Sequence, residues 1–274
     1  MFELGGQGSA NKEIIWAIPS SSEGPNMNQW HMGALPTDFN QNGMGAGWGI
    51  CTSTWWFYDT FEPSDTRKTY LLDHYTNAAG EVIDRNTPNS PLATGPIPLK
   101  IGYDPSVLGS GGYSDIDVII YRYADVLLMY AEAVNELYGP REDAQEALKR
   151  VRRRAFASSL HAEKVDTYVA SLTNEQDFFQ AIMNERKWEF GGEGIRKYDL
   201  ARWNKYGEVI YNLYNEMINW GLVANGTAVP GIEKVPERIY YKSVPDPEHA
   251  GRTVLDIVGI DEYGPRWDVL PVMR

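Results

Sequence analysis

The sequence predicts a mostly helical protein with long irregular loops, and three observations carry this prediction. Apolar residues recur at spacings of three and four over residues 123–137, which is typical of an amphipathic helix. Two further helical stretches, 174–190 and 196–220, lie on either side of a glycine-rich break. The chain before and after the helical stretches is rich in Gly, Pro, Ser and Asn, and this composition favours loops.

We expect these 274 residues to form a single region with three parts. The parts are a loop-rich, aromatic part (1–113), a helical part (114–220) and an extended segment that wraps the helices (221–274).

Composition excludes several classes of protein. The net charge of −12 argues against a protein that follows nucleic-acid phosphates. No apolar run approaches the roughly 20 residues that span a bilayer, and the first residues lack the basic and apolar stretches of a signal peptide. Cys51 is the only cysteine, which excludes an internal disulfide and a cysteine-rich metal site.

The N-terminal part begins with a predicted strand and a long loop. Residues 12–18 (KEIIWAI) form a short apolar run that ends at Pro19, as strands do. Residues 20–49 are too polar for a packed helix and contain Trp30 and Trp48. Loops longer than about 12–15 residues are usually functional or disordered, and the aromatic rings favour function. We expect a binding loop, with a plain scaffold as the open alternative.

Residues 52–67 predict a short helix that starts at a Ser or Thr cap and ends at Pro63. Phe57 and Phe61 are four residues apart, so both should face the core. The remaining Trp and Tyr rings of this helix cannot all share that face, and at least one should meet solvent or a ligand. Residues 70–100 carry turn signals and weak alternation, which leave a hairpin and irregular chain both open.

A helical hairpin follows, and we expect it to begin at Asp117. The apolar positions of its first helix are Tyr123, Leu127, Tyr130, Val134 and Leu137. Gly139 ends this helix, and small alanines line the inner face of the second, 144–155. A short turn predicts antiparallel neighbours, packed closely as in tetratricopeptide hairpins. A solenoid needs about three such units, so this single hairpin must pack on something else.

The segment Asn184–Trp203 concentrates charged residues among aromatic rings. The charged residues of the cluster are Glu185, Arg186, Glu189, Glu193, Arg196, Asp199 and Arg202. Arg186 falls within an apolar helical stripe, where a guanidinium needs a carboxylate partner. Paired carboxylates can perform acid–base catalysis, but each acid here has a basic residue within helical reach. We therefore expect a structural ionic cluster and no catalytic residue.

Metal and cofactor signals are weak. Asp115 and Asp117 have the spacing of calcium-loop ligands, but the glycine and glutamate that such a loop requires do not follow. The four histidines show no ligand spacing. We expect no metal and no cofactor.

Three stretches together resemble the SusD/RagB family of outer-membrane nutrient-binding lipoproteins. They are YRYADVLLMYAEAVNEL (121–137), ALKRVRRRA (147–155) and ERKWEFGGEGIRKYDLARW (185–203). The strand KEIIWAI, the segment DTFEPSDTR (59–67) and the final Leu270-Pro271 also fit. The resemblance covers nearly the whole chain and implies a SusD-like fold.

The resemblance also implies that family members are usually longer. Their N-terminal half carries the lipoprotein signal, the lipidated cysteine and most tetratricopeptide helices. We expect this chain to match the C-terminal half, with apolar surface exposed along Tyr123–Leu137 and any membrane attachment through a lipid anchor outside it.

The function that the resemblance implies is capture without catalysis. A glycan is bound at the outer membrane, on its outer face, and passed to a TonB-dependent, SusC-like transporter as partner. Sugar rings have apolar C–H faces that stack on indoles, and hydroxyls that need polar partners. We expect Trp30, Trp48 and Trp55 to stack on the sugar, with Asn28 and His31 as polar partners. A structural role for each ring remains the open alternative.

Two other functions stay open. One is a tetratricopeptide-type protein-interaction module that binds no sugar. The other is a glycoside hydrolase, which needs two carboxylates about 5–10 Å apart across a cleft. Asp59, Glu62 and Asp65 are the nearby acids.

Overall fold

The computed structural model describes most of the chain as two compact units, which are treated separately. The described residues are 11–21, 29–41, 45–100, 114–219, 236–245, 247, 250–251 and 253–262. The first unit covers residues 1–194 and the second covers 195–274. The predictions for Asn28 and for Leu270-Pro271 lie outside the described residues.

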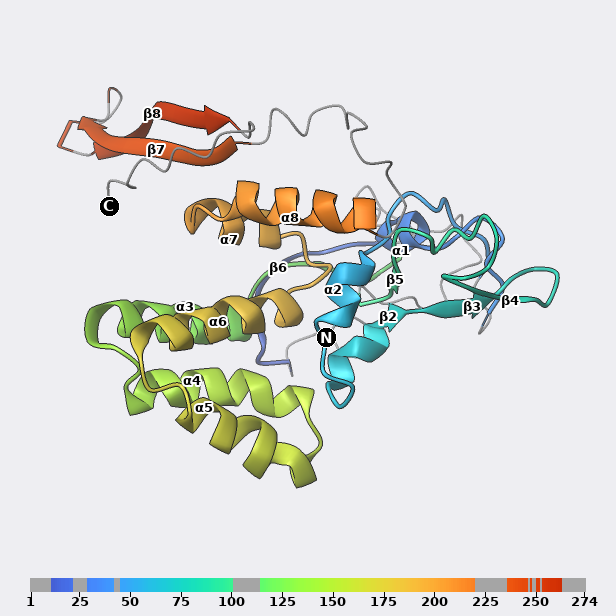
Figure 1. Cartoon of the computed structure of the whole chain (residues 1–274), viewed down its shortest axis with the longest axis horizontal. Helices are drawn as coiled ribbons and strands as arrows, with labels where there is room; N and C mark the ends of the chain where they lie inside the picture. The colour runs from blue at the N-terminus through green and yellow to red at the C-terminus, as the bar shows by residue number, and fades with distance from the viewer. Residues whose placement is uncertain are drawn as a thin grey trace. The chain divides into compact units, whose positions relative to one another are not determined.

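The first unit is built around three helices, α3 (Tyr123–Tyr138), α4 (Glu142–Arg152) and α6 (Glu175–Glu189). Helices α3 and α4 form the predicted hairpin, with α6 against it (Figure 1). Gly139 adopts a φ of +76° at the end of α3, which a residue with a side chain rarely adopts. The mostly helical fold with long loops is thereby confirmed, while the tetratricopeptide assignment stays a prediction.

Shorter helical segments complete the first unit. They are α1 (Trp30–Ala34), α2 (Trp55–Asp59), α5 (Tyr168–Ala170), a π-helical turn (Ala162–Thr167) and 3-10 helices at Thr66–Tyr70, Arg153–Ala155 and Ser158–Leu160. Thr54 caps α2 as predicted, because its hydroxyl oxygen accepts a hydrogen bond from Phe57 N at 3.2 Å.

The described strands pair in twos, and every pair is antiparallel. The pairs are β1 (Ile14–Ile18) with β6 (Val118–Arg122), β2 (Leu71–Leu72) with β5 (Ile97–Pro98), β3 (His74–Thr76) with β4 (Val82–Asp84), and β7 (Pro236–Pro245) with β8 (Thr253–Glu262). The strand predicted over residues 12–18 is confirmed as β1.

The start of the helical hairpin differs from the prediction. Residues 118–122 form strand β6, and the helix begins only at Tyr123. The apolar run that precedes Tyr123 suits a strand as well as a helix, and pairing with the distant β1 decides the outcome.

The predicted helix 196–220 is likewise divided into α7 (Arg196–Arg202) and α8 (Tyr206–Asn219). Asn204 lies between them with a φ of +55°.

The face that helix α3 buries shares only Val134 with the apolar stripe predicted from the sequence. The buried positions are Ala124, Asp125, Leu128, Ala131, Val134 and Asn135. Tyr130 and Leu137 remain 47% and 68% exposed, so the expected apolar surface along Tyr123–Leu137 is present. Ala124 and Ala131 are fully buried, and small residues of this kind let packed helices approach closely.

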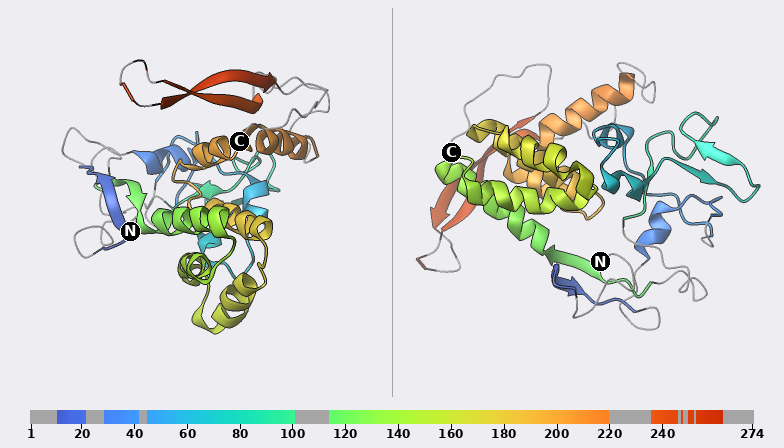
Figure 2. Two further views of the ribbon diagram at one scale, coloured as in Figure 1. Left: turned by 90° about the vertical axis from the view of Figure 1, so that its left-hand side faces the viewer. Right: turned by 90° about the horizontal axis from the view of Figure 1, so that it is seen from below.

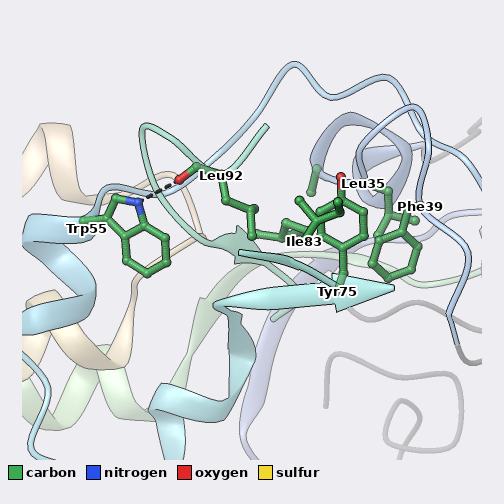
Figure 3. Close-up of a cluster of buried hydrophobic side chains, with 8 residues drawn as sticks. Leu35, Phe39, Trp55, Tyr75, Ile83 and Leu92 are labelled. Carbon is green, nitrogen blue, oxygen red and sulfur yellow. Dashed lines mark hydrogen bonds between the residues drawn. The ribbon is translucent and has the colours of Figure 1, made fainter. Parts of the chain in front are cut away.

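A second core lies under the loops of the first unit. It consists of Ala34, Leu35, Phe39, Trp55, Tyr75, Ile83, Leu92 and Ile97. Figure 3 shows Phe39 beside Tyr75, with Trp55 at the other end of the cluster. The ring centroids of Phe39 and Tyr75 are 5.3 Å apart, and the Tyr75 hydroxyl donates a hydrogen bond to Asp38 at 2.6 Å. These contacts anchor residues 38 and 39 of the loop that was predicted to bind.

The exposed face of α3 should bind a hydrophobic dye. Replacing Met129 and Leu137 by serine removes exposed apolar surface, so the fluorescence of 8-anilinonaphthalene sulfonate should fall while the melting temperature stays unchanged. Leu128→Ala is the matched buried control and should cost about 2–5 kcal/mol of stability. Equal dye fluorescence from the double serine variant and the unsubstituted protein would contradict this account.

Candidate functional site

The candidate site is the loop around α1, where two indole rings face solvent. Trp30 opens α1 and is 57% exposed, and Trp48 follows in the returning chain and is 47% exposed. Large aromatic rings bury most of their surface in ordinary cores. Two half-exposed indoles on one loop therefore mark a surface that is suited to recognition.

Backbone hydrogen bonds hold the two indole-bearing segments together. Trp48 N donates to Met32 O at 2.7 Å, and Gly49 N donates to Leu35 O at 2.8 Å. Gly47 makes the close approach possible, because a Cβ atom there would lie 2.4 Å from the Leu35 carbonyl oxygen. The returning segment thus runs along α1, which fixes the backbone of both tryptophans.

Trp55, the third predicted stacking residue, lies in the core instead. Only 4% of its surface is exposed, and its indole nitrogen donates a hydrogen bond to Leu92 O at 2.7 Å (Figure 3). The guanidinium carbon of Arg85 lies 3.6 Å from the ring centroid. A ring covered in this way offers no face to a sugar, so Trp55 is not carried into the proposal below.

Neither of the predicted polar partners can be placed. Asn28 lies outside the described residues, and His31 belongs to α1, where its side chain is outside the described part. Across the part of the chain that the structure describes, no group of three or more His, Cys, Asp or Glu residues is arranged to hold a metal ion.

Sequence reasoning missed one aromatic pair. Trp16 on β1 and Tyr121 on β6 face each other across the strand pair, with ring centroids 5.9 Å apart. They are 56% and 50% exposed. The available signal was Trp16 within KEIIWAI, but an apolar strand gave no reason to expect that its tryptophan points to solvent.

The ionic cluster of the first unit is centred on Arg122, which is only 2% exposed. Its guanidinium contacts Glu189 at 2.6 Å and Glu193 at 2.7 Å, and it also reaches Glu13 at 3.2 Å. Lys100 pairs with Glu193 at 2.6 Å. Every one of these groups is largely withdrawn from water, so each charge depends on its partners for stabilisation.

Glu185 forms the second part of this cluster. One carboxylate oxygen contacts Arg67 at 2.7 Å, and the other contacts Arg152 at 3.0 Å. Arg186 pairs instead with Asp125 at 2.7 Å. The structure thus differs from the expected pairing at helical spacing, because these partners come from elements far away along the chain.

The second unit holds the remaining residues of the predicted cluster. Asp199 accepts a hydrogen bond from the guanidinium of Arg202 at 3.0 Å, three residues along α7. Arg196 lies with its guanidinium carbon 5.6 Å from the ring centroid of Trp203. Here the expected helical spacing does describe the contact between acid and base.

Electrostatics fix the charge state of Glu189. Burial alone would raise the pKa of this carboxyl, but attraction to Arg122, and then to Lys100, Arg154 and Arg67, outweighs burial and lowers the pKa to about 2. Burial lowers the pKa of Lys100 despite the nearby Glu193. The cluster is therefore a set of matched charges rather than a poised acid and base.

The fold and this loop together define a mostly helical protein with two exposed indole rings on the α1 loop. The sequence profile of the SusD family matches residues 93–250, which is more than half of the chain, so the protein belongs to the SusD family. This membership confirms the family resemblance that the sequence motifs indicated.

The chain is similar to several SusD-like proteins. SusD-like protein P25 of Formosa agariphila is 43% identical over 95 residues, which are 35% of this chain and 17% of that protein. A SusD homolog from Bacteroides thetaiotaomicron superposes with a TM-score of 0.56 at 22% identity, covering 80% of this chain and 46% of the other.

A third similar structure holds a ligand. It is surface glycan-binding protein A from Bacteroides thetaiotaomicron in complex with laminarihexaose, with a TM-score of 0.51, 21% identity, and coverage of 74% of this chain and 46% of the other. At this identity the likeness is one of fold. The chain spans about a sixth of the Formosa relative and less than half of either solved structure.

The buried cluster predicts how stability depends on pH. Glu189 has a folded pKa of about 2 against an ordinary value of 4.5, so its contribution is complete above about pH 4.5 and is lost as the pH falls towards 2. The loss should be roughly 3 kcal/mol, measured by urea unfolding at a series of pH values. The Glu189→Gln variant should lose less free energy of unfolding over this pH range. The Glu163→Gln variant, which changes an exposed acid, should follow the unsubstituted protein. Parallel curves for all three proteins would contradict the prediction.

Proposed function

We propose that this protein captures a glycan at the cell surface without catalysis and passes it to a TonB-dependent transporter of the outer membrane. The observation that carries the proposal is the pair of exposed indoles, Trp30 and Trp48, on one hydrogen-bonded loop. Family membership and the fold shared with a glycan-binding protein solved with laminarihexaose support it. The outer-membrane location and the SusC-like transporter partner rest on the expected role of the family.

The loop suits a sugar ligand for physical reasons. An indole presents a flat apolar face, and a pyranose ring presents a matching face of C–H bonds. The backbone of Trp48 and Gly49 is already held against Met32 and Leu35 by hydrogen bonds, so ordering this part of the loop costs little additional conformational entropy on binding.

Two of the three acids considered for a glycoside hydrolase, Glu62 and Asp65, are engaged in close ion pairs. Glu62 contacts Arg152 at 3.2 Å and Lys164 at 3.0 Å, and Asp65 contacts Arg67 at 2.7 Å. A carboxylate that is committed to ion pairs within its own fold is a poor general acid or nucleophile.

A protein-interaction module remains the second candidate function. The observation that favours it is the exposed apolar face of α3, where Leu137 and Tyr138 are 68% and 65% exposed. Under this alternative the loop indoles would contribute nothing to binding.

Affinity electrophoresis and calorimetry across a panel of soluble glycans that includes laminarihexaose should separate the two functions. At least one glycan should bind, and Trp30→Ala or Trp48→Ala should weaken binding about tenfold because each removes a stacking surface. Tyr138→Ala removes an equally exposed ring from α3 and should leave the affinity unchanged. Unchanged binding by both tryptophan variants would remove the proposed site, and release of reducing sugar would overturn the binding function.

A further inference from the structure

The segment that returns along α1 is attached to it by a continuous set of backbone hydrogen bonds. Each residue from 47 to 51 donates its backbone N–H to a carbonyl oxygen of residues 32–36, over distances of 2.7–3.0 Å. Trp48 lies within this set, with bonded neighbours on both sides along the chain. The position of its indole therefore depends on how closely the whole segment lies against α1.

Gly47, which precedes Trp48, makes this close approach sterically possible. A Cβ atom at residue 47 would lie 2.4 Å from the carbonyl oxygen of Leu35 and 2.6 Å from that of Met32. Both atoms belong to the backbone, so no rotation of a side chain relieves the clash. Any side chain at this position would push the segment away from α1 and break the hydrogen bonds that hold Trp48.

Gly49, which follows Trp48, is required for a different reason. Its φ is +60°, in the left-handed region that side chains other than those of Asn and Asp rarely adopt. Space is not the constraint here, because a Cβ atom would meet Pro36 Cα at an ordinary 3.7 Å. The two glycines on either side of Trp48 thus supply one close approach and one turn of the backbone.

We propose that Gly47 and Gly49 are positioning residues of the glycan site. Together they let the returning segment lie against α1, which holds Trp48 beside the helix that begins at Trp30 before any sugar arrives. A surface that is placed in advance loses less conformational entropy on binding. The inference rests on the proposed glycan-binding function and assigns part of its affinity to two residues that act only through an indole.

Glycan affinity supplies the first test. Gly47→Ala should weaken binding of the tightest-binding glycan of the panel about tenfold, as Trp48→Ala does, because the indole loses its fixed position. Gly45→Ala is the matched control, since a Cβ atom at residue 45 meets no atom within 4 Å and should leave the affinity unchanged. An unchanged affinity of Gly47→Ala would overturn its assignment.

A pair of variants at residue 49 tests the same claim without a steric clash. Asn and Val have similar volumes, but Asn enters the left-handed region and a β-branched residue does not. Gly49→Val should therefore weaken glycan binding by about fivefold, and Gly49→Asn should stay within about twofold of the unsubstituted protein. Equal affinities of the two variants would show that backbone conformation at residue 49 does not position the indole.

A spectroscopic measurement follows the indole without any ligand. The protein is labelled with 5-fluorotryptophan, and the Trp48 resonance is assigned from its absence in Trp48→Phe. This resonance should shift in Gly47→Ala and stay in place in Gly45→Ala, while the resonance of the buried Trp55 is the same in both. A Trp48 resonance that stays in place in Gly47→Ala would contradict the proposed role.

Leu128→Ala separates positioning from a general loss of stability. Leu128 is buried in α3, so this variant should lower the melting temperature, while its folded fraction binds the glycan with unchanged affinity. If its folded fraction binds as weakly as Gly47→Ala, the effect is not specific to the loop and the inference is wrong.

The outcomes distinguish this inference from the proposed function. If Trp30→Ala or Trp48→Ala weakens binding while Gly47→Ala and Gly49→Val bind normally, the positioning role is wrong and the glycan-binding function stands. If both glycine variants and both tryptophan variants bind normally, the site on this loop is wrong as well. If no glycan of the panel binds, both proposals fail.

Discussion

The buried guanidinium of Arg122 is the contact on which the first unit depends. It is 2% exposed, and its carboxylate partners Glu13, Glu189 and Glu193 come from the segment before β1, from α6 and from the chain beyond α6. A buried charge is tolerated only when its donors are matched, and removal of one partner typically costs about 3–5 kcal/mol. Any arrangement that separates these segments would leave the guanidinium uncompensated. Charge matching therefore specifies how β1, β6 and α6 come together.

The charged cluster also fixes neighbouring elements of the first unit. Glu13 also accepts a hydrogen bond from Ala124 N at 3.1 Å, so the same carboxylate fixes the strand that carries Trp16 and the first turn of α3. Phe61, which follows the end of α2, contacts Trp188 of α6, with ring centroids 6.3 Å apart, and Trp55 of α2 anchors the loop core. The three views in Figures 1 and 2 show these helices grouped together, with the β1–β6 pair beside them. The charged residues of this cluster thus pair with one another, and exposed aromatic rings remain available to ligands.

The sequence predicted the elements that are determined by residues close together along the chain. Periodicity identified the α3–α4 hairpin, and a polar segment containing tryptophans identified the loop on which Trp30 and Trp48 are exposed. Contacts between distant segments could not be predicted in this way. Strand β6 was assigned to a helix because its partner β1 lies about a hundred residues earlier. The partners of Glu185 were expected nearby, yet Arg67 lies 118 residues away along the chain.

Trp16 and Trp55 show why the same residue type has opposite fates. Both stand in short apolar segments, and nothing in their immediate neighbours separates them. Trp55 is covered because its indole N–H donates to the Leu92 carbonyl oxygen and its ring packs within the core under the loops. Trp16 belongs to a two-stranded sheet in which its ring contact is Tyr121, itself half exposed. Exposure of an indole is therefore set by which distant segments fold against it, and the rings left partly uncovered are those that can still gain energy by stacking on a ligand.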